Sequence, residues 1–479
     1  MEKEKLFEEI KRGIRSRKAK SLINAELDLL YKLDVSKEMQ SNFWTIITLI
    51  RWTIEFGVFH LYSPKATVND VIALVNKLNQ LEDTYHRENL PKKNVNWDYV
   101  FHQIANQQLE YQNIITKYTF IRQLILFNYD DNIKDKFQKI NGFAVSEWIN
   151  ELLLLCMYLV GQANPKNTHV QYIGRLQNDF FELFAEKRKL NRSQIFIESI
   201  SINVDDSFSA KERLKNISAI KNPLYQIFDQ FKFSLYPIIK IDGAYRVIHR
   251  QLLDICFKYN IYDNMKSAYG NDFTQEFGRQ IERYVRLGLD ELSEKYSTDN
   301  EKKKFNNSPD FVVTDNVIIE CKGIETPVVV SVNPTTQNLE RYLKDSIYKA
   351  FEKQILEAAK NIDSNRLFGV VITYKETNMG FGRRCARKLF KDDSSNPLIK
   401  YIKSDDIFVL AIEEWDIILN ACKNHKLTLH EILSLISDLE KSSSKMHPSM
   451  HVFDYFGTGD MTLEYLNSES PLLFEWIKD

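Results

Sequence analysis

The sequence has no apolar run long enough to cross a lipid bilayer. Its most apolar run, Leu152 to Val160, has 9 residues, whereas a membrane-spanning helix needs about 20. The N-terminal stretch MEKEKLFEEIKRGIRSRKAK carries charges of both signs and has a helical apolar period, unlike a signal peptide. The sequence therefore predicts a cytoplasmic protein that does not contact a membrane.

Several motifs that would carry other chemistry are missing. The 5 cysteines are far apart, without a CxxC pair, which excludes a disulfide framework and an iron–sulfur cluster; they are Cys156, Cys256, Cys321, Cys385 and Cys422. No GxxxxGK[ST] segment is present, so a P-loop motor is not expected. His447 and His451 stand four apart, but no glutamate follows His447. A zinc-protease motif is therefore absent, and both histidines are interpreted as structural or surface residues.

The chain also lacks an excess of charge of either sign. Its 64 lysines and arginines against 65 aspartates and glutamates give a net charge of −1, which removes any bulk-charge argument for nucleic-acid binding. Any phosphate-binding surface must therefore be local. One candidate is the run GFGRRCARKLFK, which contains Arg383, Arg384, Arg387 and Lys388. An ordinary solvated basic helix face explains this run equally well.

The length of 479 residues favours more than one domain. Residues 1–235 have apolar residues at helical spacing and predict an all-α N-terminal domain for scaffolding, sensing or partner docking. Within it, the alternating pattern from Ile195 to Val204 predicts a strand or an extended connector. Residues 236–479 predict an α/β domain with a central mixed sheet flanked by helices and a C-terminal helical extension.

Turn signals and apolar periods predict the elements of this second half. The Asp242-Gly243 pair predicts a β-hairpin. Helices are expected through Phe277 to Leu289 and through Leu339 to Ala358. Buried strands are expected at 368–374 and 407–412, and further helices follow them.

Three ionisable residues border one predicted hairpin, in the stretch SPDFVVTDNVIIECKG (Ser308 to Gly323). Glu320 and Lys322 are two apart in a strand and share one face, while Cys321 points to the other face. A three-residue loop, Thr314-Asp315-Asn316, would place Asp310 opposite Glu320 on the same face. This interpretation expects Asn316 to adopt the left-handed conformation that such loops favour at their end.

Two carboxylates that converge repel each other unless a cation lies between them. Their hard oxygen atoms suit Mg²⁺, with Mn²⁺ as a substitute. A lysine beside such an ion could orient an attacking water and stabilise the charge of a phosphoryl transition state. The chemistry predicted from these residues is phosphodiester hydrolysis.

The segment Pro309-Asp310, nine further residues and Glu320-Cys321-Lys322 resembles the PD-(D/E)xK phosphodiesterase superfamily, which has the restriction-endonuclease-like fold. This resemblance covers about residues 236–420. It implies a metal-dependent nuclease, with DNA favoured over RNA as the substrate. A helical N-terminal half fused to such a core is also similar to prokaryotic nucleases of phage-defence loci.

The resemblance also implies roles for residues outside the hairpin. The family often has a glutamate on the preceding helix, in a pattern matched by Gly278, Ile281, Glu282, Tyr284 and Val285. The third acidic role therefore passes to Glu282, with Glu276 as the rival six residues away.

The predicted metal ligands are Asp310, Glu320 and Glu282, with the backbone carbonyl of Cys321 as a further ligand. Lys349, Lys353 and Gln354 come from the helix after the ExK strand. The two lysines are expected to contact nucleic acid, and Gln354 to contact the catalytic lysine or the phosphate.

Two other interpretations stay open. The first keeps the fold as a catalytically idle nucleic-acid-binding scaffold. The second makes the helical half a partner-sensing module. A homodimer is a further expectation, because cutting both DNA strands with one site per chain requires two protomers.

Overall fold

The structure is a computed structural model. It describes residues 2–35, 43–59, 62–89, 115–161, 175–176, 190–217, 231–297, 308–314, 316–323, 325, 336–375, 397–441, 448–457 and 459–474.

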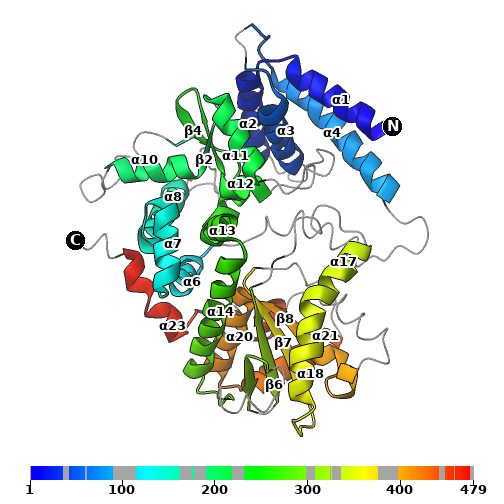
Figure 1. The fold of residues 1–479 in the computed structure, drawn as a ribbon, viewed down its shortest axis with the longest axis vertical. Helices are drawn as coiled ribbons and strands as arrows, with labels where there is room; N and C mark the ends of the chain where they lie inside the picture. Colours follow the sequence, from blue (N-terminus) through cyan, green and yellow to red (C-terminus); the bar gives the residue numbers. More distant parts are fainter. Residues whose placement is uncertain are drawn as a thin grey trace.

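Four helices at the start of the chain pack together at one end of the molecule (Figure 1): α1 (Glu2–Arg15), α2 (Ala19–Val35), α3 (Phe43–Phe56) and α4 (Val68–Asn89). Their buried faces form one apolar core with parts of α11 (Ser207–Ile217), α12 (Phe231–Leu235) and the start of α13 (Arg250–Tyr269). Apolar residues at three- and four-residue spacing, such as Ile46, Ile47 and Ile50 of α3, supply this core, as the sequence predicts.

A small mixed sheet packs against these helices. Its strands lie in the order β1-β4-β3-β2; they are β1 (Arg175–Leu176), β2 (Ser201–Asn203), β3 (Ile238–Ile241) and β4 (Ala244–Val247). The predicted hairpin at Asp242-Gly243 is confirmed: φ is 50° at Asp242 and 75° at Gly243, and β3 and β4 pair antiparallel. β2 pairs parallel to β3, so the sheet joins residues from both sides of residue 235.

The strand predicted from Ile195 to Val204 is only partly right. α10 (Leu190–Ser199) occupies the first half of that stretch, and β2 begins only at Ser201. Phe196, Ile197 and Ile200 are buried in one core. Their spacing of one and four residues fits one helix face, whereas adjacent residues of a strand point to opposite faces, so the helix prevails.

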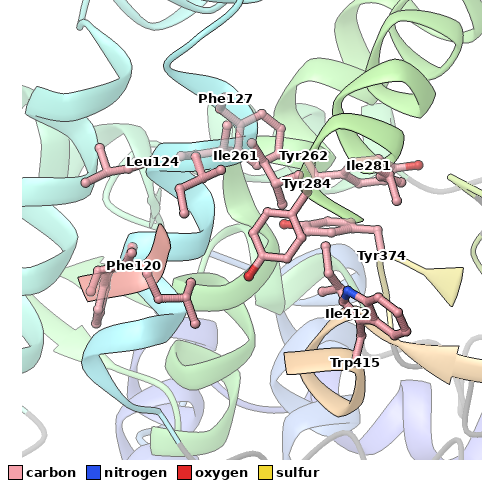
Figure 2. Packing of buried hydrophobic residues seen from close by; sticks show 14 of the residues in the cluster. Phe120, Leu124, Phe127, Ile261, Tyr262, Ile281, Tyr284, Tyr374, Ile412 and Trp415 are labelled. Carbon is pink, nitrogen blue, oxygen red and sulfur yellow. The ribbon is translucent and has the colours of Figure 1, made fainter. Parts of the chain in front are cut away.

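The middle helices join a second core. It contains buried residues of α13 and α14 (Asn271–Glu291) together with those of α6 (Lys117–Phe127), α7 (Asp131–Asn141) and α8 (Val145–Gly161). Figure 2 shows Phe120, Leu124 and Phe127 of α6 gathered with Tyr262 of α13 and Tyr284 of α14. The core of the helical half is thus continuous with the core of the α/β half.

The second sheet has the strand order β5-β6-β7-β8. Its members are β5 (Phe311–Val313), β6 (Val317–Lys322), β7 (Phe368–Thr373) and β8 (Ile407–Ala411). β5 is antiparallel to β6, while β6, β7 and β8 run parallel. β7 and β8 are buried along their whole length, which confirms the two buried strands expected from the sequence, although β8 lies at the end of the strand order.

Helices cover both faces of this sheet (Figure 1). One face packs against α14 and α20 (Ile412–His425). The other packs against one long helix made of α17 (Thr336–Leu343), η4 (Lys344–Tyr348), η5 (Phe351–Ile355) and α18 (Leu356–Ala359). The remaining elements are η6 (Pro397–Lys400), η7 (Ser404–Asp406), α21 (Leu429–Lys441), α22 (Pro448–Phe456), α23 (Glu464–Asn467) and η8 (Ser470–Phe474). Helices with two small mixed sheets agree with the expected helical plus α/β layout.

Within the described ranges, no single helix is long and apolar enough to span a membrane. α7 and α8 reach that length and composition only when taken together, and a bend of 60° separates them.

Candidate active site

The hairpin of β5 and β6 has the register that the sequence predicted. Val313 pairs with Val317, which leaves a three-residue loop between them. Of the two loop residues that the structure describes, Thr314 is left-handed, with φ of 47°, and the prediction that Asn316 adopts this conformation is wrong. Thr314 is held there by the preceding segment, because its amide donates to Lys295 O (2.8 Å) and its hydroxyl to Glu294 (3.1 Å).

This register brings Asp310 to the end of β6. Phe311 pairs with Ile319, so Asp310 precedes the pair and lies opposite Glu320. The Asp310 carboxylate accepts a hydrogen bond from the backbone amide of Cys321 at 2.6 Å. A half-buried carboxylate is therefore fixed next to the strand that carries the ExK residues.

Glu320 and Lys322 project from the same face of β6, as expected from their spacing. The Lys322 Nζ lies 2.5 Å from Glu320 Oε1 and donates to Gln354 Oε1 at 3.0 Å. Gln354 belongs to η5 on the helix that covers this face. The predicted contact between Gln354 and the lysine is therefore present.

The surroundings of Glu320 disfavour its negative charge. The residue is only 2% exposed, and burial raises its pKa to about 7, with a further increase from the nearby Asp310 charge. Lys322 and hydrogen bonding from Gln354 oppose this rise. Within the part of the chain that the structure describes, Glu320 Oε2 is a buried oxygen without a hydrogen-bond partner.

Cys321 points to the opposite face of β6, as predicted. Its side chain is buried in the core shared by α14 and α20. Burial raises the pKa of the thiol, and the charges of Asp310, Glu320 and Glu282 raise it further. The thiol is therefore held neutral, and the backbone amide of Cys321 is the group that contacts Asp310.

The two candidate glutamates of α14 have different surroundings. Glu276 Oε1 lies 2.6 Å from Lys136 Nζ and 2.6 Å from Asn132 Nδ2, both on α7. Glu282 is half-buried, and its charge acts on the pKa of Cys321. Glu276 joins two helices, and Glu282 is close enough to β6 for its charge to act on Cys321.

The helix that carries Gln354 contains two π-helical turns, η4 and η5, which the sequence did not predict. π turns inside helices occur frequently at functional sites. Gly369 of β7 lets η5 approach the sheet: a Cβ there would lie 3.0 Å from Phe351 and 3.2 Å from Ile355. Because Gln354 directly precedes Ile355, this close packing brings its side chain to Lys322.

The expected nucleic-acid contacts are only partly within the described structure. Lys349 and Lys353 are exposed on the η4–η5 helix, in which Gln354 also lies. The four basic residues of the predicted phosphate-binding run, Arg383, Arg384, Arg387 and Lys388, lie outside the described residues. His447 does as well, while His451 is buried at 3% exposure.

The carboxylates fit a divalent cation only as a partial ligand set. Among the described residues, no group of three or more histidine, cysteine, aspartate or glutamate side chains is arranged to hold a metal ion. Asp310 and Glu320 nevertheless act on each other electrostatically, and the buried Glu320 Oε2 has no hydrogen-bond partner in the described part of the chain. Two carboxylates with remaining positions for water and substrate oxygens suit Mg²⁺.

An ionic cluster next to the site was missed by the sequence reasoning. Lys375 follows β7 and lies 2.5 Å from Asp263 and 3.0 Å from Glu325, two residues after Gly323. A lysine directly after an apolar strand was the available signal. Asp263 gave none, because an aspartate inside a helical pattern usually faces solvent.

No protein-family model, no curated protein and no solved structure matches this chain. The arguments for a function therefore come from the geometry of the site and from the motif itself.

Proposed function

We propose that this chain is a metal-dependent nuclease that hydrolyses phosphodiester bonds, with DNA as the favoured substrate. The observation that carries the proposal is the convergence of Asp310, Glu320 and Lys322 on one sheet end, with a buried Glu320 oxygen that has no hydrogen-bond partner among the described residues. Two carboxylates and one lysine meet there, and a bound cation would reduce the repulsion between the carboxylates.

Each residue has a chemical role in this proposal. Asp310 and Glu320 hold Mg²⁺ together with the backbone carbonyl of Cys321, and Glu282 binds a second ion or orients water. The ion supplies charge neutralisation at the phosphate and lowers the pKa of bound water. Lys322 positions the nucleophile and stabilises negative charge, while Gln354 orients the Lys322 ammonium group.

The substrate assignment follows from the motif resemblance and from two exposed lysines. Lys349 and Lys353 lie on the same helix as Gln354, at a spacing that places both on one helix face. Exposed ammonium groups next to a phosphodiesterase site would contact the nucleic-acid backbone. A role in anti-phage defence is part of the proposal on the same resemblance.

The test compares the native chain with Asp310→Asn and Lys322→Met on linear, circular and single-stranded DNA and on RNA, with Mg²⁺ present. Loss of one group from a charge-stabilising site typically lowers the rate by roughly 100-fold or more, so both variants should lose at least that much. Lys77→Met is the matched control, because Lys77 is also a lysine paired with a glutamate (Glu9, 2.8 Å) but lies on α4.

Hydrolysis that survives both site substitutions would overturn the assignment of these residues. A native chain that binds DNA but cleaves none of the four substrates would instead favour the catalytically idle scaffold.

A further inference from the structure

The chain that leaves β6 after Lys322 is held by α13. The Tyr262 hydroxyl donates to Gly323 O at 3.3 Å, one residue after Lys322. Lys266, one turn further along α13, forms an ion pair with Glu325. The end of the ExK strand is thus fixed on its C-terminal side by two side chains of one helix.

Lys375 at the end of β7 completes this attachment. Its Nζ lies 2.5 Å from Asp263 Oδ1 and 3.0 Å from Glu325 Oε2. It also lies 5.2 Å and 5.1 Å from the ring centroids of Tyr259 and Tyr262. Figure 2 shows Tyr262 beside Tyr374, the residue that precedes Lys375. One buried ammonium group therefore joins α13, β7 and the segment after β6.

The stability of the fold alone gives a weak reason for this cluster. Lys375 and Asp263 are both buried, and moving their charges out of water costs free energy that their attraction only partly returns. Apolar side chains of similar volume would stabilise the fold at least as well. An ionic cluster has instead a directional geometry, which fixes the atoms that it joins.

The position of Lys322 requires such precision. Its Nζ must reach Glu320 on its own strand and Gln354 on the opposite helix at the same time. On the N-terminal side, the amide of Cys321 is fixed by Asp310. On the C-terminal side, the Tyr262 hydroxyl holds the backbone at Gly323, one residue beyond Lys322.

We propose that Tyr262 and Lys375 are positioning residues of this site, which hold the end of β6 so that Lys322 faces its partners. They act through Gly323 and Glu325 and do not touch the substrate. The inference rests on the proposed function, because it assigns the residues that support the same catalytic lysine.

Tyr262→Phe tests the first attachment, since it removes only the hydroxyl that donates to Gly323. We expect kcat to fall about 5-fold or more, because a displaced catalytic group lowers the rate steeply. The KM for DNA and the thermal midpoint should stay close to the native values. Tyr31→Phe is the matched control, because Tyr31 also donates to a backbone carbonyl (Val247 O, 2.6 Å) but lies on α2.

The Lys375 attachment is tested by the double variant Lys375→Met/Asp263→Asn. The second substitution avoids leaving a buried aspartate without its lysine, so that the protein can fold. The expected result is again a lower kcat with an unchanged KM, measured well below the unfolding temperature.

If Tyr262→Phe and Lys375→Met/Asp263→Asn both keep the native kcat while Lys322→Met is inactive, the positioning role is overturned and the proposed function stays intact. An inactive native chain, or full activity in Lys322→Met, would overturn the proposed function and this inference with it. A purely structural role would lower the thermal midpoint without changing kcat in the folded protein, and this result would also contradict the proposal.

Discussion

Two glutamates of α14 differ in the groups that surround them, and sequence spacing alone does not show this difference. Glu276 and Glu282 lie on the same helix, but Glu276 is engaged by Lys136 and Asn132 of α7. Glu282 acts electrostatically on the thiol at the end of β6. Glu282 is therefore the glutamate of α14 to which the proposal assigns a catalytic role.

Glu282→Gln should therefore lower Mg²⁺-dependent hydrolysis by about 100-fold or more, as removal of a charge-stabilising group does. Glu276→Gln should leave the rate near the native value and lower the free energy of unfolding by up to about 1 kcal/mol. The measurements are initial rates and urea unfolding of both variants. An unchanged rate in Glu282→Gln with a reduced rate in Glu276→Gln would reverse the assignment.

A buried carboxyl in the helical half leads to a pH-dependent prediction. Burial raises the pKa of Glu26 to about 8, against a hydrogen bond from the Thr53 hydroxyl that lowers it. Between its ordinary value of 4.5 and 8, the folded chain keeps a proton that the unfolded chain has lost. The stability that this carboxyl contributes is present below pH 4.5 and is lost as the pH rises through this window.

Glu26→Gln removes the loss of stability at rising pH, because the amide does not ionise. We expect the variant to exceed the native chain by about 1–3 kcal/mol in free energy of unfolding near pH 8, with little difference near pH 5. Urea unfolding at several pH values measures this slope. The control is Glu8→Gln at an exposed position, which should keep the native dependence of unfolding free energy on pH. If Glu26→Gln also keeps the native dependence, the assigned role of Glu26 is wrong.

Residue-level reasoning from the sequence predicted the hairpin side chains well. The two-residue spacing placed Glu320 and Lys322 on one face, and loop length placed Asp310 opposite Glu320. The Tyr262 and Lys375 attachments were not predictable in this way. They depend on contacts between residues more than 50 positions apart, such as Tyr262 with Gly323 and Lys375 with Asp263.

At the scale of elements, close packing of helices on the second sheet determines where the site residues lie. Gly288 of α14 faces α20, and a Cβ at this position would lie 2.2 Å from Leu419 Cδ1. At Gly278 of the same helix, an added Cβ would meet no heavy atom of another described element within 4 Å. The two glycines form a matched pair on the helix that carries Glu282.

Gly288→Ala should lower the free energy of unfolding by about 1–3 kcal/mol, because the added methyl group overpacks the contact with α20. Gly278→Ala should leave stability unchanged or raise it by up to about 1 kcal/mol, because alanine favours the helix. Thermal or urea unfolding of both variants measures the difference. Equal stabilisation by both substitutions would show that α14 does not approach α20 this closely.

Element prediction from the sequence succeeded where the apolar period was unambiguous and failed where two structures share one pattern. The buried strands β7 and β8 were predicted because their short apolar runs are rich in β-branched residues. The stretch from Ile195 to Ser199 became helical, because its buried residues Phe196 and Ile197 lie on one helix face with Ile200. The π turns η4 and η5 were not predicted, and the close packing of η5 against Gly369 is a contact that no local pattern contains.

The whole molecule is joined by contacts that cross the middle of the chain. The Arg122 guanidinium on α6 binds the buried carboxylate of Asp416 on α20, with an Nη2–Oδ2 distance of 2.6 Å. Asp416 also accepts hydrogen bonds from the hydroxyls of Tyr284 (2.8 Å) and Tyr465 (2.7 Å). β2 pairs with β3 across residue 235. The helical half and the α/β half thus depend on each other for their cores.

A fragment of residues 1–235 should therefore fail to fold as a cooperative unit. It lacks β3, the partner strand of β2, and it leaves Arg122 without Asp416. Loss of one partner of a buried ion pair typically costs about 3–5 kcal/mol of folding free energy. Circular dichroism and thermal unfolding of the fragment beside the full chain measure this. A cooperative transition with native-like helix content would contradict the prediction and favour an independent partner-sensing module.

The central claim is that two carboxylates and a lysine at the end of β6 form a metal-dependent site for phosphodiester hydrolysis. The most direct test is the rate of DNA cleavage by the purified chain as a function of Mg²⁺ concentration. The account predicts a saturable increase that EDTA abolishes and added Mg²⁺ or Mn²⁺ restores. Cleavage that does not depend on the metal ion, or no cleavage at any Mg²⁺ concentration, would contradict it.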